Sequence, residues 1–364
     1  MRMSLYTAAL AATSLAFCTS ALAEQGAIDV LDQNGRRVLL DEPAQRVATI
    51  PMPAASMFTS VAGGVDRLAA MHPASKTALE DGILGEFYPD AAMIPSDIVG
   101  NGFMPNIESL LTVNPDLVLQ WAHRGSDIIE PLEQAGLSVA TLNYGTEEYA
   151  QGWIQLLGDV LGEEEKSQRM IQWRDQTLAD IGSQLADVPE AEKPRTLYFL
   201  RFLSEYRVAG EGTYNDFYID LAGGSNPAEG NNWLTIDAEQ ILNWDPEVIL
   251  LNGFEAGLSP QDVYDNPLFA DVSAVVNRRV YHVPLGGYRW DPPNQESPLM
   301  WMWLSSLLQP GQVDYDLRQE MRDAYQWIYG QTPSERQLNE ILRIEHNQNA
   351  AGYEQFLNPA LASQ

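Results

Sequence analysis

Cysteine is almost absent from this 364-residue chain, in which Cys18 is the only one. One thiol excludes a disulfide framework, and it excludes a metal site built from several thiolates. Cys18 also lies in the first segment of the chain, which we expect to be removed. The working protein should therefore have no cysteine and thus no cysteine nucleophile.

Long apolar runs are also missing, apart from one near the start. Residues 5–16 are mostly apolar, and Ala21-Leu22-Ala23 stands directly before Glu24. A short apolar region followed by a small-x-small site is typical of a cleavable secretory signal. We therefore expect a signal peptide over residues 1–23 and a mature chain that begins at Glu24.

Two other interpretations of this first segment compete with simple cleavage. A membrane anchor would need about 20 apolar residues, and the run is shorter than that. A lipoprotein signal would use Cys18, but the bulky Phe17 directly before it argues against lipidation. Export is argued from the signal alone, because the mature chain would have no cysteine and hence no disulfide to indicate it. No later apolar stretch is long enough to span a bilayer.

Basic residues are scarce: 21 Lys and Arg stand against 50 Asp and Glu, which gives a formal net charge of −29. Such a charge excludes nucleic acid as a partner, because the phosphate backbone would be repelled. The acidic residues are scattered along the chain rather than gathered in one tail. Scattered acidic residues favour high solubility as the reason for the charge.

Histidine is scarce too, with His72, His123, His282 and His346 in the whole chain. A receptor for free zinc or manganese needs three or four His and carboxylate ligands, so we expect no metal site and treat His72 and His123 as loop residues. There is no Gly-x-Ser-x-Gly elbow, no phosphate loop and no His-Glu-x-x-His. We therefore predict no catalytic residue and no cofactor, although an enzyme or metallochaperone on the same scaffold stays open as a minor alternative.

The chain divides into six segments by its hydrophobic pattern. After the signal, an alternating segment with an Asn34-Gly35 turn predicts an N-terminal hairpin over residues 24–45. Short apolar runs between helical stretches then predict two α/β lobes. Residues 163–188 keep a helical period and would span roughly 36 Å, long enough to bridge two lobes. The remaining boundaries are an N-terminal lobe at 46–150, a helical connection at 151–192, a C-terminal lobe at 193–310 and a helical tail at 311–364.

One segment occurs twice. Glu108 precedes Pro115 and Glu239 precedes Pro246 by the same seven positions, and each proline is followed by an acidic residue and three aliphatic residues. In both copies the pattern predicts a short helix, a turn and a buried strand. Two lobes built on one plan follow from this repeat.

With this repeat, residues 46–310 resemble the periplasmic-binding family of ABC importers, the receptors for iron-siderophore complexes, haem and vitamin B12. Residues 221–226 and 274–284 add weaker matches in the same order. The resemblance implies two Rossmann-like lobes joined by one long helix, with the ligand cleft between them. It also implies a periplasmic, monomeric receptor that delivers a small-molecule metal complex or anion to an ABC permease at the inner membrane. Ferric siderophore is the first expectation for the ligand, with corrinoid, haem and molybdate-like oxyanion as alternatives.

Candidate ligand-binding residues lie where strands of both predicted lobes end, which is where open α/β sheets bind ligands. Aromatic and Arg side chains dominate there; they stack on flat ligands and bind anions. Trp121 and Trp233 also match, through the resemblance, pocket tryptophans of the vitamin B12 receptor, whereas the alternative for each is a core aromatic. The candidates are Trp121, Arg124 and Tyr144 in the first lobe and Arg201, Trp233, Tyr288, Arg289 and Trp290 in the second.

Glu108 and Glu239 carry a different expectation. Through the resemblance they match the acidic pair on the outer tips of the two lobes, which docks on arginines of the permease. The alternative is a solvated acidic residue in the first turn of a helix, favoured there by the helix dipole.

Overall fold

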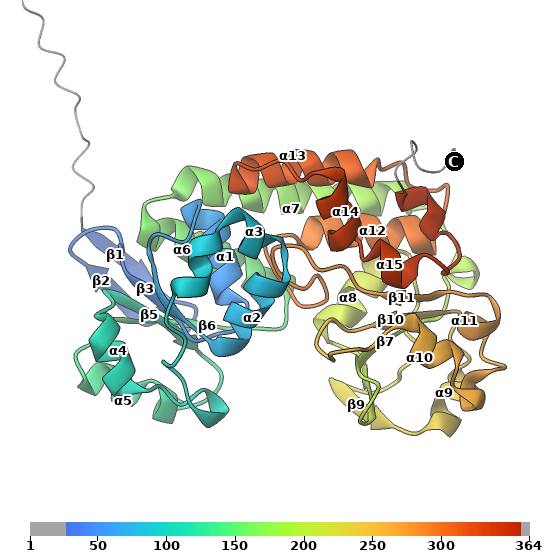
Figure 1. Ribbon diagram of the computed structural model, residues 1–364, viewed down its shortest axis with the longest axis horizontal. Helices are drawn as coiled ribbons and strands as arrows, with labels where there is room; N and C mark the ends of the chain where they lie inside the picture. The colour runs from blue at the N-terminus through green and yellow to red at the C-terminus, as the bar shows by residue number, and fades with distance from the viewer. Residues whose placement is uncertain (1–26, 358–364) are drawn as a thin grey trace, which may run out of the picture.

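The computed structural model describes residues 27–357 and shows two α/β lobes side by side (Figure 1). The expected signal peptide over residues 1–23 and the expected start at Glu24 lie outside the described residues. Among the helices of residues 27–357, none has both the length and the apolar character that crossing a membrane requires.

The N-terminal lobe is built on a four-stranded parallel sheet in the order β4-β3-β5-β6. An antiparallel hairpin of β1 and β2 precedes it, with Ile28 paired to Leu40. The strands are β1 (Ile28–Leu31), β2 (Arg37–Leu40), β3 (Val47–Thr49), β4 (Leu68–Met71), β5 (Leu117–Trp121) and β6 (Val139–Leu142). The helices are α1 (Ala54–Ala62), α2 (Pro73–Asp81), α3 (Ile83–Phe87), α4 (Ile107–Val113), α5 (Glu130–Gln134) and α6 (Glu147–Leu161).

The C-terminal lobe has a five-stranded sheet in the order β11-β10-β7-β8-β9. Its strands are β7 (Thr196–Arg201), β8 (Tyr206–Ala209), β9 (Trp233–Ile236), β10 (Val248–Leu251) and β11 (Val280–His282). Its helices are α8 (Tyr214–Leu221), α9 (Ala238–Trp244), α10 (Pro260–Tyr264), α11 (Ser273–Val276) and α12 (Ser297–Leu308). The β7, β10 and β11 strands are parallel, whereas β8 and β9 pair antiparallel at one side. This sheet is therefore mixed rather than mostly parallel.

The burial of the central strands explains why apolar runs in the sequence predicted them. Every residue of β5 and of β10 is buried. A strand covered by helices on both faces has no polar side to alternate with, so it appears as a continuous apolar run. By contrast, β9 is only half-buried along most of its length and gives no such run.

The repeated segment forms the same structure in both lobes. Asn106 begins α4 by accepting a hydrogen bond from the Ser109 amide, and Asp237 begins α9 by accepting one from the Gln240 amide. Both helices end at a left-handed residue that is not glycine, Asn114 with φ 46° and Asp245 with φ 41°. Asparagine and aspartate tolerate this conformation better than other side chains. The two-lobed plan that the sequence predicted is thus confirmed.

An arginine before the first strand of each lobe fixes the repeated helix in place. In the N-terminal lobe, the Arg46 guanidinium donates to the carbonyls of Val113 and Asn114 at the end of α4. In the C-terminal lobe, Arg195 donates in the same way to Trp244 and Asp245 at the end of α9.

The acidic residue after each proline completes this contact. Asp116 accepts a hydrogen bond of 2.9 Å from the Arg46 amide, and Glu247 accepts one of 3.0 Å from the Arg195 amide. Each helix end is therefore capped from a neighbouring strand, which satisfies carbonyls that a helix leaves free.

The long helix α7 (Glu164–Gln184) runs from one lobe to the other (Figure 1). It packs on α6 of the N-terminal lobe and on α8 and α12 of the C-terminal lobe. It ends four residues earlier than the period predicted, with Leu185 as its C-cap. The α6 helix packs on α1 and β1 as well as on α7, so it links the N-terminal lobe to the long helix.

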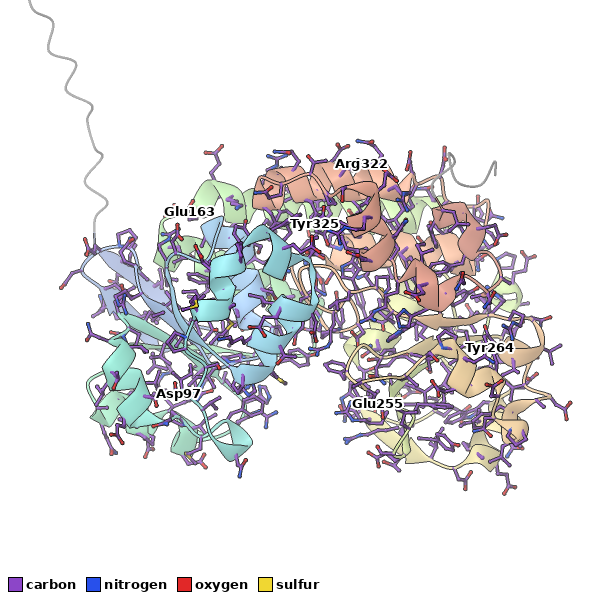
Figure 2. All side chains as sticks on the ribbon, in the orientation of Figure 1. Asp97, Glu163, Glu255, Tyr264, Arg322 and Tyr325 are labelled. Atoms are coloured by element: carbon purple, nitrogen blue, oxygen red, sulfur yellow. The ribbon has the colours of Figure 1, made fainter. Side chains whose placement is uncertain are left out.

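The C-terminal helices form a second bridge between the lobes. They are α13 (Leu317–Tyr329), α14 (Glu335–Ile341) and α15 (Ile344–Asn347). Tyr88 of the N-terminal lobe donates to the Tyr329 carbonyl at 3.0 Å, and Arg336 pairs with Glu86 at 2.7 Å. Tyr325 of α13 lies near the boundary of the lobes (Figure 2), with its ring 6.1 Å from that of Phe87. The expectation of a single joining helix was therefore incomplete.

One hydrophobic core continues through both lobes. Leu119 of β5, Leu250 of β10 and Leu338 of α14 belong to the same cluster of buried side chains. A second, smaller cluster fills the other face of the C-terminal sheet, around Leu251.

Candidate ligand-binding site

Trp121 lies at the carboxyl end of β5 with 3% of its surface exposed. Four aromatic or imidazole rings surround it at centroid distances of 5.4 to 5.8 Å: Phe103, His123, Tyr144 and Trp153. Its indole N–H is buried and has no hydrogen-bond partner within residues 27–357. Trp121 is thus the centre of an aromatic cluster at the strand end; Trp153 is buried with it, whereas Phe103, His123 and Tyr144 form the surface of the cluster.

Phe103 and Arg124 form one side of this surface. The Arg124 guanidinium lies 4.3 Å from the Phe103 ring centre and 5.8 Å from that of Trp121, within the range of a cation–π interaction. His72 also contacts Phe103, at 5.3 Å between rings. Phe103 was not among the candidate ligand-binding residues named from the sequence.

The two histidines of this lobe, His72 and His123, lie beside the aromatic cluster. His72 begins α2, where its Nδ1 accepts a hydrogen bond from the Ala74 amide. Burial lowers the pKa of His72, and burial together with the Arg124 charge lowers the pKa of His123. Both rings are therefore neutral near pH 7. Across residues 27–357, no group of three His, Cys, Asp or Glu side chains is arranged to hold a metal ion.

In the C-terminal lobe, Arg201 and Arg289 share one aromatic partner. Their guanidinium carbons lie 5.8 and 4.9 Å from the centre of the Phe254 ring. The Arg289 Nε also donates to the Gly253 carbonyl at 2.7 Å, so Arg289 is held against the loop that follows β10. This loop brings together two arginines that lie far apart in the sequence.

Glu255 holds that loop in place through hydrogen bonds to its carboxylate. Its carboxylate accepts hydrogen bonds from the Phe202 and Leu203 amides and from the Asn252 side chain. Figure 2 shows Glu255 on the side of the C-terminal lobe that faces the other lobe. Glu255 thus joins the loops after β7 and β10.

Tyr288 and Trp290 lie inside the protein rather than on the site's surface. Both are fully buried, and the Trp290 indole donates to Glu296 at 2.7 Å. Tyr325 and Tyr329 of α13 donate to the same carboxylate, and so does the Gly287 amide. The polar edge of Trp290 is thus bound within the core, and contact of Trp290 or Tyr288 with a ligand stays a prediction.

Trp233 begins β9 and keeps part of its surface exposed, with its ring 6.2 Å from that of Tyr198. The Tyr198 hydroxyl in turn donates to Asp291 at 2.5 Å. Asp291 is buried, which raises the pKa of its carboxyl group, and one of its oxygens has no partner within residues 27–357. Trp233 therefore stands at the edge of a buried polar group.

Tyr144 brings the two lobes together. It keeps 38% of its surface exposed, yet crowding by protein atoms raises the pKa of its phenol, with Tyr288 and Asp291 of the other lobe adding to the effect. Tyr144 and Pro293 line one small cavity of about 10 Å³. The aromatic cluster of the first lobe thus meets the second lobe at Tyr144.

The charges of the site differ from those of the rest of the chain. Arg124, Arg201 and Arg289 make no ion pair within the described part of the chain, although the protein has a net charge of −29. Their partners are aromatic rings instead. Two of them also donate to backbone carbonyls, Arg201 Nη1 to Leu200 and Arg289 Nε to Gly253. The N–H donors that remain can bind an anion, because no carboxylate occupies them.

Glu108 and Glu239 lie away from these arginines. Each is exposed and stands in the first turn of its helix, α4 or α9. The two helices lie on the same side of the molecule, opposite α7 and α13 (Figure 1).

Comparison with known proteins agrees with this architecture. A family model described as periplasmic binding protein matches residues 93–285. The molybdate-binding protein MolA of Haemophilus influenzae is 25% identical over 62% of this chain and 70% of its own length. The iron(3+)-hydroxamate-binding protein FhuD of Bacillus subtilis is 22% identical over 55% of this chain and 65% of its own.

Solved structures give the same picture. A periplasmic solute binding protein from Veillonella parvula superposes with a TM-score of 0.81 at 31% identity, over 89% of this chain and 99% of that one. The molybdate-bound MolA superposes with a TM-score of 0.72 at 21% identity, over 84% and 99%. The family match covers more than half of the chain, and the protein therefore belongs to the periplasmic binding protein family, the substrate-binding components of ABC importers.

Proposed function

We propose that the protein captures an anionic metal complex of the ferric siderophore type between its lobes and delivers it to an ABC permease. The observation that carries this proposal is the set of three arginines, Arg124, Arg201 and Arg289, which face aromatic rings at strand ends instead of carboxylates. They come from both lobes, as a ligand bound between lobes requires.

The net charge of the chain strengthens this argument. An anion approaching a protein of charge −29 is repelled at long range. Binding must then come from local groups, and unpaired guanidinium groups are the strongest donors that a protein has for an oxyanion or a carboxylate. The aromatic neighbours Phe103, Tyr144 and Phe254 suit a ligand with flat chelating groups, because such groups stack on rings.

A molybdate-like oxyanion is the second candidate. It is favoured by the 25% identity to MolA, whose name records molybdate binding. Similarity to FhuD, named for iron(3+)-hydroxamate, favours the first candidate. An oxyanion needs the arginines but not the rings, so the contribution of the aromatic residues separates the two.

We also propose that Glu108 and Glu239 contact arginines of the permease. Both side chains are exposed, and neither makes an ion pair within residues 27–357. They hold matching positions in the repeated segment, and their helices α4 and α9 lie on one side of the molecule (Figure 1). Exposed charges of this kind guide a partner and set its register.

The test is a tryptophan-fluorescence titration of the mature protein with ferric hydroxamate, ferric catecholate, haem, cobalamin and molybdate. Stoichiometric quenching by a ferric complex, with the complex recovered unchanged, supports the proposal and excludes turnover. Binding of molybdate but of no ferric complex would select the second candidate. If none of the five binds, the proposed ligand class is wrong.

A further inference from the structure

Two arginines stand opposite each other on the strands β7 and β8 of the C-terminal lobe. Phe199 pairs with Val208, so a regular ladder would next join Leu200 to Arg207. A register shift in β7 instead places Arg201 opposite Arg207. Residues directly opposite on antiparallel strands project to the same face of the sheet. We call Arg201 and Arg207 the arginine pair.

The arginine pair lies on the sheet face that carries aromatic residues of the candidate site. Because side chains alternate along a strand, Arg207 shares a face with Ala209 and not with Val208. Val208 belongs to the smaller hydrophobic cluster, whereas Ala209 belongs to the larger one together with Tyr198. On the neighbouring strand β9, Trp233 pairs with Ala209. Arg207 is therefore a diagonal neighbour of Trp233, at a spacing that long side chains can reach across.

The end of the sheet that bears the arginine pair faces the other lobe. The β8 strand starts beside the carboxyl end of β7, so Arg207 lies level with Arg201. The loop directly after β7 donates the Phe202 and Leu203 amides to Glu255. Figure 2 shows Glu255 on the side toward the N-terminal lobe. Ligands of open α/β sheets bind outside such strand ends, so Arg207 joins the candidate site although the sequence did not single it out.

No side chain within residues 27–357 neutralises Arg207. Its Nε is buried without a hydrogen-bond partner in that part of the chain, and its guanidinium makes no ion pair there. Like charges directly opposite on neighbouring strands are destabilising, and so is a buried donor without a partner. An anion bound between the two guanidinium groups would remove both penalties, because it accepts hydrogen bonds from both and cancels their repulsion.

We infer that the arginine pair is a subsite for the charged part of the ligand and selects ligands with a multiply charged anionic group. This inference rests on the proposed function and names the charge of its ligand. A ferric tris-catecholate complex and molybdate both carry such charge on oxygen atoms. A ferric tris-hydroxamate complex is neutral, so it would leave the two guanidinium groups repelling each other. The arginine pair thus separates ligands by charge, through repulsion that only an anion relieves.

The experiment compares Arg207→Gln with the wild type in calorimetric titrations of ferric tris-catecholate, molybdate and ferric tris-hydroxamate. The wild type should bind at least one of the two anions more tightly than the neutral complex. The variant should bind that anion about tenfold more weakly, with a smaller dependence on salt, because a charged donor is lost. Its affinity for the neutral complex should stay at the wild-type level. Arg207→Lys keeps the charge without the planar fork and should recover only part of the loss.

Melting of the ligand-free protein separates binding from folding. Arg207→Gln should melt at the wild-type temperature or above it, because the repulsion within the arginine pair is removed. A clear drop in melting temperature would assign Arg207 to the fold and overturn the inference.

Arg278→Gln is the matched control. Arg278 also belongs to the C-terminal lobe, and its guanidinium carbon lies 3.6 Å from the centre of the Tyr264 ring. It precedes β11, at the edge of the sheet opposite to β8 and β9. Its substitution removes the same charge from the same lobe and should leave the affinity for every probe unchanged.

Three results of the titrations would overturn the inference and leave the proposed function standing. They are an equal loss in Arg207→Gln and Arg278→Gln, wild-type affinity of Arg207→Gln for both anions, and tighter binding of the neutral complex than of either anion by the wild type. A wild type that binds none of the probes would overturn the proposed function itself.

Discussion

Arg174 of α7 and Glu147 of α6 form a bidentate ion pair, with Nε–Oε1 at 2.5 Å and Nη2–Oε2 at 2.6 Å. The Arg174 side chain is fully buried, and its Nη1 donates to the carbonyl of Asn294 at 2.7 Å. Tyr214 of the C-terminal lobe donates to the same glutamate at 3.3 Å. The two lobes and the helix that joins them therefore meet at one buried charge pair.

Removing one member of this pair should be costly. Arg174→Met leaves the Glu147 carboxylate without its positively charged partner. We therefore expect the free energy of unfolding to fall by about 3–5 kcal/mol. Urea denaturation followed by circular dichroism measures the change. The double variant Glu147→Gln with Arg174→Met should recover part of the loss, because no unpaired charge remains. A double variant less stable than Arg174→Met alone would contradict this explanation.

Ligand binding should depend on arginines of both lobes. Arg124→Ala and Arg201→Ala should each weaken binding of a ferric complex roughly thirtyfold, since each removes a charged donor that is not replaced. Fluorescence quenching measures both affinities. Arg169→Ala serves as a control, because Arg169 lies over the Trp327 ring, on the helices that join the lobes. Equal affinity of all three variants would place the ligand elsewhere.

Trp121 should contribute to ligand binding directly and also by holding the neighbouring rings in place. Trp121→Ala removes the centre of a four-ring cluster, so we expect weaker binding of a ferric complex together with a lower melting temperature. Tyr144→Phe keeps the ring and should retain most of the affinity. Calorimetric titration and thermal melting separate the two effects. Unchanged affinity in Trp121→Ala would assign this residue to the core alone.

Substitution of Glu108 and Glu239 should abolish uptake but leave ligand affinity unchanged. Glu108→Lys with Glu239→Lys reverses two exposed charges that lie away from the arginines, so affinity for the ligand should stay at the wild-type level. Transport into intact cells should be lost, because opposed like charges at a rim slow the encounter with a partner. Uptake of a labelled ferric complex, compared with titration in solution, tests this. Normal transport by the double variant would remove these residues from the docking surface.

Acid should destabilise the fold through His282. Burial and the Arg343 charge lower its pKa from the ordinary 6.5 to about 3, and its Nε2 lies 2.9 Å from the Asn252 carbonyl. A depressed folded pKa means that stability is present above pH 6.5 and is lost as pH falls toward 3. The loss should approach about 1.4 kcal/mol per pH unit in this window. His282→Gln should flatten the pH dependence by that amount, and urea denaturation at pH 7, 5.5 and 4.5 checks it. Parallel curves for both proteins would contradict it.

Much of the fold could be predicted because its signals are local. The repeat around Glu108 and Glu239 combines a helix cap, a proline and a buried strand, all within a few residues, and each part has a sequence signature. The bridge made by the C-terminal helices could not be predicted in this way. Glu86 and Arg336 are paired although 250 positions separate them. The local sequence around neither residue predicts this ion pair.

The candidate site was predictable in position but not in detail. Strand ends indicated where Trp121, Arg124 and Arg201 would lie. Trp290 shares the composition of such a loop, but its indole donates to a buried carboxylate six residues later, that of Glu296, which also accepts hydrogen bonds from two tyrosines of α13. That Phe254 is the shared partner of Arg201 and Arg289 follows only from the structure, in which its ring centre lies 5.8 and 4.9 Å from their guanidinium carbons.

The core that runs without a break from β5 through β10 to α14 has a consequence for how the molecule comes apart. Lobes that shared only a linker would melt one after the other, each with its own heat-absorption peak. Here neither lobe can lose its packing without exposing apolar surface in the other. Scanning calorimetry should therefore show one transition whose calorimetric and van't Hoff enthalpies agree, and a proteolytic cut within α13 should lower the melting temperature of both lobes together.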